Sequence, residues 1–217
     1  MNGTNTPPPD QTGLDNVVKR IERINRIRNT LTTIGILILA PIIAFFITAF
    51  VFQSYQVDGN SMQTTLQPND RLIVWKLPRT WAKITHHQYV PKRGDIVIVT
   101  ESGLSNYGDT QDTKQIIKRV IGLPGDHIVI KNNHITIYNA ANPKGFDPDV
   151  TLPYNKDGHI PITDNDINIT LGKNQLFICG DNRSNSLDSR IFGPIQTSQV
   201  VGKLVARIYP FSNIEKF

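Results

Sequence analysis

Three short segments of this 217-residue chain concentrate hydroxyl, amine and carboxylate side chains. They read GNSMQTTL at 59–66, KRVIGLPGD at 118–126 and GDNRSNSLDSRIFG at 180–193. The first holds a candidate nucleophile, Ser61, and the second a candidate base, Lys118. Because a serine hydroxyl attacks a carbonyl only when a neighbouring base takes its proton, a serine paired with a neutral amine could carry out acyl transfer.

Lys118 is unusual because it lies in an apolar run, next to Ile117, Val120 and Ile121. Its side chain either extends into solvent, as most strand lysines do, or is poorly solvated. In the second case burial disfavours the ammonium form and lowers the pKa. A pKa lowered from roughly 10.4 to about 8 corresponds to ~3 kcal/mol. Such an amine could accept a serine proton without the help of a histidine.

The sequence lacks the motifs of other common catalytic and metal sites. The chain has no GxSxG, HExxH or P-loop motif. Its single cysteine, Cys179, excludes an intramolecular disulfide and a CxxC site, and is expected to be a buried structural thiol. The run Asp164, Asp166, Asn168 begins like a calcium loop, but Ile169 stands where the loop needs glycine. We therefore expect no metal site and no cofactor.

The three segments resemble the motifs of bacterial type I signal peptidases. Residues 61–66 are similar to the family's nucleophile motif, in which Ser-Met precedes a Pro-Thr-Leu-like turn. Residues 118–126 match the base motif, and residues 180–193 match GDNRxNSxDSR followed by glycine. One departure is Thr64, where the family usually has a proline that restricts φ. The turn is expected to form nevertheless.

The resemblance implies a role for each matching residue. Ser61 would attack the scissile carbonyl, and Lys118 would act first as general base and then as general acid. Ser186 would hydrogen-bond the lysine and orient it. The Ser61 backbone N–H would donate to the oxyanion, and Gly59 stands where some members carry a second, hydroxyl donor. The supporting polar network would consist of Arg119, Asn185, Asp188 and Arg190.

The resemblance also implies a substrate class, namely secretory preproteins cut after small-x-small motifs. A signal peptide is expected to bind as an extended strand and to pair with exposed strand edges. The expected contact residues are Tyr55, Gln56, Val57, Asp58, Gln115, Ile116 and Ile117.

The elements that must position these residues begin with an apolar segment. No charged residue lies between Arg28 and Asp58, and the 22 residues 31–52 are nearly all apolar. As a helix they would span ~33 Å, which matches a hydrocarbon core of roughly 30 Å. Five Lys and Arg residues precede the segment. They predict a cytoplasmic N terminus and an extracytoplasmic C-terminal part.

A cleavable signal sequence and a buried helix of a soluble protein are less consistent with this apolar segment. A signal sequence would have a shorter apolar core and a small-x-small site after it, whereas this segment continues as FVFQSYQV. A buried helix of a soluble protein would normally show a polar stripe. A single membrane anchor is therefore expected, with the lipid bilayer as a partner and the cell membrane as the location.

The rest of the chain reads as short strands. Ile- and Val-rich runs bounded by Gly, Pro, Asn or Asp are typical of strands, and Asn132-Asn133 reads as a hairpin turn. We predict a mainly β fold, in which one transmembrane helix precedes an antiparallel β-sheet catalytic domain of signal-peptidase type with a small inserted β/loop excursion. The expected strands are 70–76, 95–100, 115–121, 127–138, 175–180 and 200–209. The expected limits are 1–30 for a disordered, basic cytoplasmic segment, 31–53 for the membrane helix and 54–217 for the catalytic domain, with the insertion at about 139–172.

Charge argues against nucleic acid as a partner. The net charge is +5 and the pI about 9.3, but residues 31–217 hold 18 bases and 15 acids. This excess is too small for a nucleic-acid-binding face. Two alternatives stay open: a self-cleaving repressor-type Ser-Lys peptidase, which would need a DNA-binding helical domain, and a catalytically silent membrane-anchored binding protein, which the departure at Thr64 favours.

Overall fold

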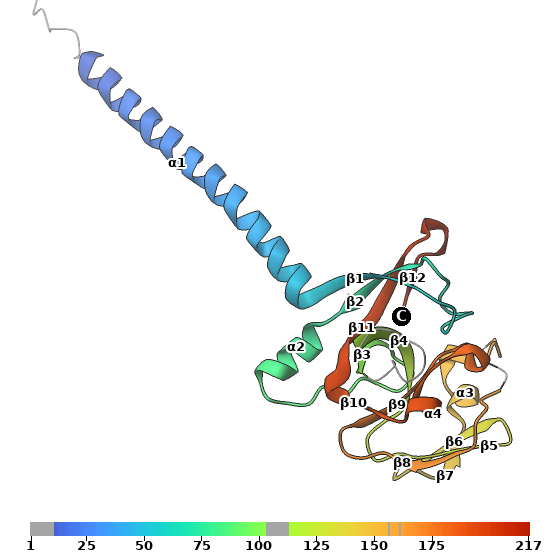
Figure 1. Cartoon of the computed structure of the whole chain (residues 1–217). Coiled ribbons are helices and arrows are strands. Elements are labelled where there is room, and N and C mark those ends of the chain that lie inside the picture. The colour runs from blue at the N-terminus through green and yellow to red at the C-terminus, as the bar shows by residue number, and fades with distance from the viewer. Residues whose placement is uncertain (1–10, 103–112, 156, 161) are drawn as a thin grey trace, which may run out of the picture. The chain divides into compact units, whose positions relative to one another are not determined.

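The computed structural model describes residues 11–102, 113–155, 157–160 and 162–217 (Figure 1). The chain forms two compact units, Met1–Ile47 and Thr48–Phe217. Of the segment 1–30 that was expected to be disordered, residues 1–10 lie outside the described residues, whereas residues 11–30 are helical and correct that expectation.

The first unit is dominated by one long helix, α1 (Gln11–Phe46), which continues as a π-helical turn, η1 (Ile47–Val51). The helix begins well before the apolar segment because Ile21, Ile24 and Ile27 already recur at helical spacing. Among the described residues, one helical stretch, 19–51, is long and apolar enough to cross a membrane. It ends before Phe52, slightly earlier than the expected span, because Phe52 already pairs with Trp75 in a sheet.

The second unit contains a large antiparallel sheet with the strand order β1-β2-β11-β3-β4-β9-β10, in which β12 also pairs with β11. Its interior is lined by Val, Ile and Leu side chains, among them Val97, Val99 and Leu204, which have no exposed surface. The strands are β1 (Phe52–Gln56), β2 (Arg71–Trp75), β3 (Ile96–Ser102), β4 (Thr113–Gly122), β9 (Gln175–Cys179), β10 (Ile195–Gln196), β11 (Val200–Tyr209) and β12 (Glu215–Lys216).

A smaller sheet has the order β7-β6-β5-β8. The predicted hairpin is confirmed, because β5 and β6 are joined by Asn132 and Asn133, both with positive φ. The inserted excursion adds β7 and β8 to this hairpin, so the second sheet begins at His127 rather than at residue 139. The strands are β5 (His127–Lys131), β6 (His134–Asn139), β7 (Asn142–Phe146) and β8 (Ile167–Thr170).

The two sheets share a hydrophobic cluster in which Ile121 and Phe177 of the large sheet pack with Ile128 and Ile137 of the small one. Cys179 lies in this cluster and is buried and free, as predicted. The insertion is therefore packed onto the end of β4, the strand that carries Lys118.

The predicted fold class is confirmed, since the domain is mainly antiparallel β with one preceding apolar helix. All six predicted runs contain strands. Strands β1, β7, β8, β10 and β12 and the helices after α1 were not predicted. Those helices are α2 (Leu77–Ile84), α3 (Pro148–Thr151) and α4 (Ser189–Phe192), with 3-10 turns at Pro153–Asn155, Arg183–Asn185, Thr197–Gln199 and Phe211–Asn213.

Candidate active site

Ser61 and Lys118, 57 residues apart in the chain, lie side by side. The Lys118 Nζ donates a hydrogen bond of 2.6 Å to the Ser61 Oγ. Ser61 is half-buried in the turn that follows β1, and Lys118 projects from β4 with 4% of its surface exposed. Of the two possibilities for Lys118, a solvent-exposed lysine or a poorly solvated one, the structure has the second.

Burial changes the acidity of this amine. It lowers the pKa of Lys118 to about 8, because the ammonium form loses its hydration. The carboxylates of Asp188 and Asp181 oppose this effect, while the Arg190 guanidinium adds to it. A lysine with this pKa holds a larger neutral fraction near neutral pH than an exposed lysine does.

The turn that carries Ser61 is fixed on its apolar side by the core. Met62 is 1% exposed and Leu66 fully buried, and both pack in a cluster with Val57 and Leu72. The Leu66 N–H donates to the Met62 carbonyl at 2.9 Å and closes the turn. The turn thus forms with Thr64 in place of the proline.

The polar side of the same turn is held by the residues that follow β9. The Asn182 backbone N–H donates to the Ser61 carbonyl at 3.0 Å, and the Thr65 hydroxyl donates to Asp181 at 2.6 Å. The Arg207 guanidinium, from β11, donates to the Thr65 carbonyl at 2.8 Å. Two segments that are distant in the chain therefore fix the turn that carries Ser61.

Arg119, the residue after the candidate base, does not contact Ser61. Because consecutive strand residues point to opposite faces, it reaches Asp181 instead and forms two hydrogen bonds of 2.8 and 2.6 Å. It also donates to the Gly94 carbonyl and lies 4.4 Å from the centre of the Tyr154 ring. Arg119 thus supports the segment that holds the Ser61 turn.

Asp188 and Arg190 form a second buried pair beneath the site. The Asp188 carboxylate accepts from the Gly180 N–H at 3.0 Å and from Arg190 at 2.9 Å. Arg190 donates onward to the Arg183 carbonyl at 2.7 Å, and Arg183 pairs with Asp149 of the insertion. These contacts fix the loop 180–190 on both sides.

Ser186 does not hydrogen-bond Lys118 as the resemblance implied. It is buried, but its Oγ has no hydrogen-bond partner among the described residues. Asn185 is exposed on the 3-10 turn Arg183–Asn185, and Gly59 is exposed with φ of 89°. The structure thus brings the two candidate reactive groups together but leaves the predicted orienting hydroxyl unpaired.

A cleft of about 270 Å³ opens at the Ser61–Lys118 pair. Both residues line it, together with Leu72, Ile98 and Leu187, which the sequence analysis did not single out. All seven residues expected to contact substrate line it as well: Tyr55, Gln56, Val57, Asp58, Gln115, Ile116 and Ile117. Strand β4 pairs with β9 only at residues 119–122, so β9 does not cover 115–117.

Sequence reasoning missed several supporting residues. Asp181 stood within the third motif but was given no role, and Thr65 stood within the first. Tyr154 and Asp149 come from the insertion, where nothing in the local pattern indicated contact with the site. Among the described residues, no group of three or more His, Cys, Asp or Glu side chains could hold a metal ion.

Comparison with known proteins assigns the chain to a family. The family model described as signal peptidase, peptidase S26, matches residues 29–209. The chain belongs to this family. Its relatives include signal peptidase I P of Bacillus subtilis subsp. natto, 32% identical over 86% of this chain and 92% of the relative. Another is signal peptidase I of Bacillus caldolyticus, which is 35% identical over 75% of this chain and 82% of the relative.

A solved structure, that of a signal peptidase I from Enterococcus faecalis V583, is 24% identical and covers 54% of this chain and 99% of the other, with a TM-score of 0.39. Membership of the family identifies the protein as a peptidase that removes signal peptides from preproteins. The apolar N-terminal helix is consistent with a membrane anchor.

The close packing of Gly180 against Ser61 provides a test of how the Ser61 turn is positioned. A Cβ on Gly180 would lie 2.3 Å from the Ser61 carbonyl oxygen, which is backbone. Gly180→Ala should displace the Ser61 turn and lower kcat by a factor of ~10². The kcat is measured from the rate of preprotein cleavage at saturating preprotein concentration.

Gly122→Ala is the matched control for Gly180→Ala, because its Cβ would meet only side chains, those of Ile128, Leu171 and Phe177. It should lower the free energy of unfolding by roughly 1–3 kcal/mol and affect kcat little at temperatures where the protein is folded. Equal kcat losses in both variants would contradict a specific role for the contact between Gly180 and Ser61.

Burial of Lys118 predicts a cost in stability. Since its pKa is about 8 in the folded chain and 10.5 as the ordinary value, the unfolded chain binds this proton more tightly. Lys118→Met should raise the free energy of unfolding at pH 7 by about 1–3 kcal/mol. The stability advantage of Lys118→Met should shrink as the pH rises from about 8 to about 10.5. In this range the amine of the folded wild type has lost its proton while that of the unfolded chain still holds it. Denaturant unfolding in detergent at several pH values measures it, and an advantage independent of pH would contradict a buried, titrating amine.

Proposed function

We propose that the chain removes signal peptides by a Ser-Lys mechanism, with Ser61 as nucleophile and Lys118 as general base. The observation that carries this proposal is the 2.6 Å hydrogen bond between the Lys118 Nζ and the Ser61 Oγ, inside a cleft lined by strand residues. No histidine lines that cleft.

In the proposed reaction the neutral Lys118 amine takes the proton of the Ser61 hydroxyl while the Oγ attacks the scissile carbonyl. The resulting ammonium gives its proton to the departing amine, and the C–N bond breaks to leave an acyl-enzyme. A water molecule, activated by the same amine, then attacks the ester and releases the signal peptide as a carboxylic acid. The Ser61 backbone N–H would donate a hydrogen bond to the negative charge that develops on the carbonyl oxygen.

Ser186 is proposed to act as a positioning residue for Lys118. Its Oγ is buried without a partner among the described residues, and an unpaired buried hydroxyl is costly. A rotation about the Ser186 Cα–Cβ bond when substrate binds would let the Ser186 hydroxyl hydrogen-bond the Lys118 amine. The supporting ion pairs, Arg119–Asp181 and Asp188–Arg190, would hold the site rather than react.

The substrate is proposed to bind as an extended strand along β1 and residues 115–117. Both segments border the cleft, and residues 115–117 lack a β9 partner. An added strand would gain backbone hydrogen bonds and present alternate side chains to the cleft. Apolar walls such as Ile98 and Ile116 suit small side chains, in keeping with cleavage after small-x-small motifs.

The membrane arrangement is likewise proposed. The helical stretch 19–51 would cross the bilayer once. The five bases between residues 19 and 28 would keep the N terminus in the cytoplasm and place the catalytic unit outside it. The nucleophile, ten residues beyond the end of that stretch, would then work near the surface where signal peptides end.

Substitution of the two proposed reactive residues tests the function. Ser61→Ala and Lys118→Ala should each lower preprotein cleavage in detergent by a factor of ~10³ or more, because nucleophile and base act as a unit. Cleavage is followed by gel, and mass spectrometry of the mature product locates the cut. Lys131→Ala, an exposed lysine of the small sheet, is the matched control and should cleave normally.

The cleavage assay also separates the alternatives. A cut after a small-x-small site supports the proposal, self-cleavage alone would favour a repressor-type peptidase, and no cleavage would favour a silent binding protein. Retained activity in either Ala variant would contradict the pair as the reactive groups.

A further inference from the structure

The Thr65 hydroxyl, which helps to fix the Ser61 turn, also meets a histidine of the insertion. The His159 Nε2 lies 3.3 Å from the Thr65 Oγ, although the two residues are 94 positions apart in the chain. The same oxygen donates to Asp181 at 2.6 Å and accepts from the Arg119 Nη2 at 3.5 Å. The His159 ring therefore joins the insertion directly to the turn that carries Ser61.

The partners of the Thr65 hydroxyl decide where its single proton points. The Asp181 carboxylate is paired with Arg119 and can only accept, so the Thr65 proton points to Asp181. If the His159 Nε2 were bare, two acceptors would face each other without a proton between them. The contact therefore requires that the His159 Nε2 carries a proton and donates to the Thr65 Oγ. The neutral ring protonated at Nε2 and the imidazolium both satisfy this requirement.

The backbone that carries His159 is fixed by hydrogen bonds. The next residue, Ile160, is buried, and its N–H donates to the Asn155 Oδ1 at 2.8 Å. The Asn155 Nδ2 donates to the Ile160 carbonyl at 3.0 Å and to the Asp149 carbonyl at 2.9 Å. Asp149 in turn pairs with Arg183. The half-buried His159 ring thus extends from a fixed segment, so its bond restrains Thr65 rather than a loose loop.

His159 stands outside the cleft that holds Ser61 and Lys118. Among the described residues, those that line the cleft do not include it. Its ring instead borders a separate cavity of about 330 Å³, on the other side of the Ser61 turn, which Gln63 and Thr64 also line. An effect of His159 on a reaction in the cleft must therefore pass through Thr65.

We propose that His159 is a positioning residue for Ser61 and acts through Thr65. The inference rests on the Ser-Lys mechanism proposed above. A hydroxyl that accepts a hydrogen bond becomes a stronger donor, so the His159 ring strengthens the bond from Thr65 to the segment after β9. Arg119 ties the same segment to β4, the strand of Lys118. The insertion thus helps to keep the Ser61 Oγ at 2.6 Å from the Lys118 Nζ.

Other contacts than this bond hold the insertion in place. Its sheet packs on the large sheet through Ile128 and Ile137, and Asp149 pairs with Arg183. Variants of His159 are therefore expected to fold, and unfolding by denaturant in detergent checks that they do.

Two amides of different length test the hydrogen bond. The side-chain nitrogen of glutamine lies about as far from Cα as the Nε2 of histidine, whereas that of asparagine reaches only as far as Nδ1. His159→Gln should therefore keep the donor and cleave preprotein normally. His159→Asn should lower kcat by roughly 3- to 10-fold, the loss expected for one hydrogen bond, and leave KM unchanged.

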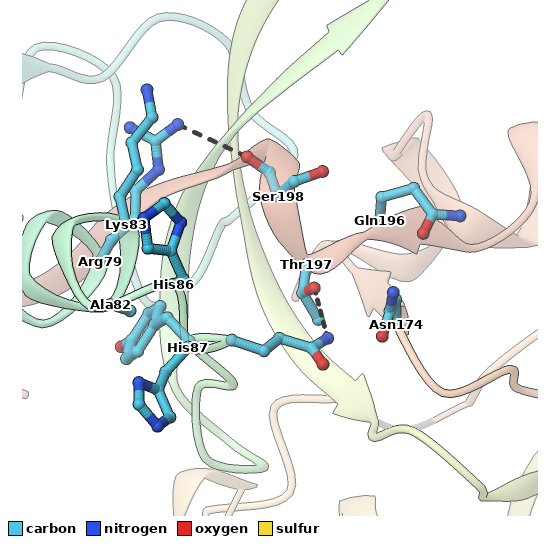
Figure 2. Close-up of a pocket in the computed structure, with 11 residues that line it drawn as sticks. Arg79, Ala82, Lys83, His86, His87, Asn174, Gln196, Thr197 and Ser198 are labelled. Atoms are coloured by element: carbon cyan, nitrogen blue, oxygen red, sulfur yellow. Dashed lines mark hydrogen bonds between the residues drawn. The ribbon is translucent and has the colours of Figure 1, made fainter.

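His86→Asn is the matched control. His86 is exposed and lines a different pocket, in which Figure 2 shows it on the α2 side, facing the segment around Ser198. Asparagine tolerates the positive φ of this position, which is 56°. The His86→Asn variant should keep both the kcat and the KM of the wild type.

A double-mutant cycle tests whether the effect passes through Thr65. Thr65→Val keeps the shape of the side chain and removes the hydroxyl. In that background His159→Asn should cause no further loss of kcat. If Thr65→Val does not fold, NMR spectra of the ¹⁵N-labelled histidine rings of the wild type in detergent still test the bond. The His159 signals are assigned by their absence from His159→Asn, and we expect the proton on Nε2.

Each of the following outcomes would overturn the proposal. Normal kcat in His159→Asn would mean that the bond does not affect the reaction, and equal losses in His159→Gln and His159→Asn would mean that the ring only fills space. A change in KM with kcat intact would place His159 in substrate binding. A full loss that persists in the Thr65→Val background, or an Nε2 without a proton, would exclude action through Thr65. Absence of cleavage by the wild type would instead refute the proposed function on which this role depends.

Discussion

The structure depends on one costly arrangement, an amine held out of water beside a serine hydroxyl. Lys118 is 4% exposed, and burial is the main reason that its pKa falls to about 8. A fully exposed lysine would be almost entirely charged at neutral pH and could not take a proton from Ser61. A lysine with no nearby carboxylate would be still harder to bury in its charged form. Asp188 and Asp181 offset part of the penalty without neutralising the effect.

The rest of the site serves to keep that arrangement in place. Removing one partner of a buried ion pair leaves an uncompensated charge, so such pairs constrain the segments that carry them. Arg119–Asp181 fixes the segment after β9 to β4, and Asp188–Arg190 closes the loop beneath it. The Ser61 carbonyl and Thr65 are bound by this same segment. Ser61 and Lys118 are therefore held by one continuous framework.

The inserted excursion takes part in this framework. Its Asp149 pairs with Arg183, and its Tyr154 ring lies under Arg119. Burial of Asp149 is offset by the Arg183 guanidinium, so the pKa of that carboxyl is lowered and it remains charged. Helix α3 and the 3-10 turn Pro153–Asn155 of the insertion thus stabilise the loop 180–190 and Arg119. This gives the insertion a structural role in the site although it contributes no group to the cleft.

Much of the fold and the two central residues could be predicted from sequence, for identifiable reasons. Strands rich in Ile and Val, such as β3 and β5, carry a strong local signal, and the three motifs identify Ser61 and Lys118. Strand β1 was missed because FQSYQ is polar and follows the apolar stretch without a break. Helix α2 was missed because its eight residues are held by tertiary contacts, such as the bond from the Thr80 hydroxyl to the Phe50 carbonyl, rather than by a strong local pattern. The contacts of Tyr154 and Asp149 depend on tertiary structure, which no local pattern encodes.

The unpaired Ser186 hydroxyl has a similar origin. Motif resemblance implied a hydrogen bond to Lys118, but the geometry of the loop places the Oγ beside Gly180, where a Cβ would lie 2.3 Å from it. A motif specifies which residue types come together but not the rotamer that each adopts. The partner of a hydroxyl that can rotate is therefore the least predictable part of the site.

The most direct test of the proposed pair is a titration of Lys118 itself. The full-length protein, labelled with ¹⁵N at lysine side chains and held in detergent micelles, is followed by NMR as the pH is raised. The Lys118 signal is assigned by its absence from Lys118→Ala. We predict a midpoint at a pKa of about 8. Titration near the ordinary value of 10.5 would contradict the claim that burial makes this amine a base for Ser61.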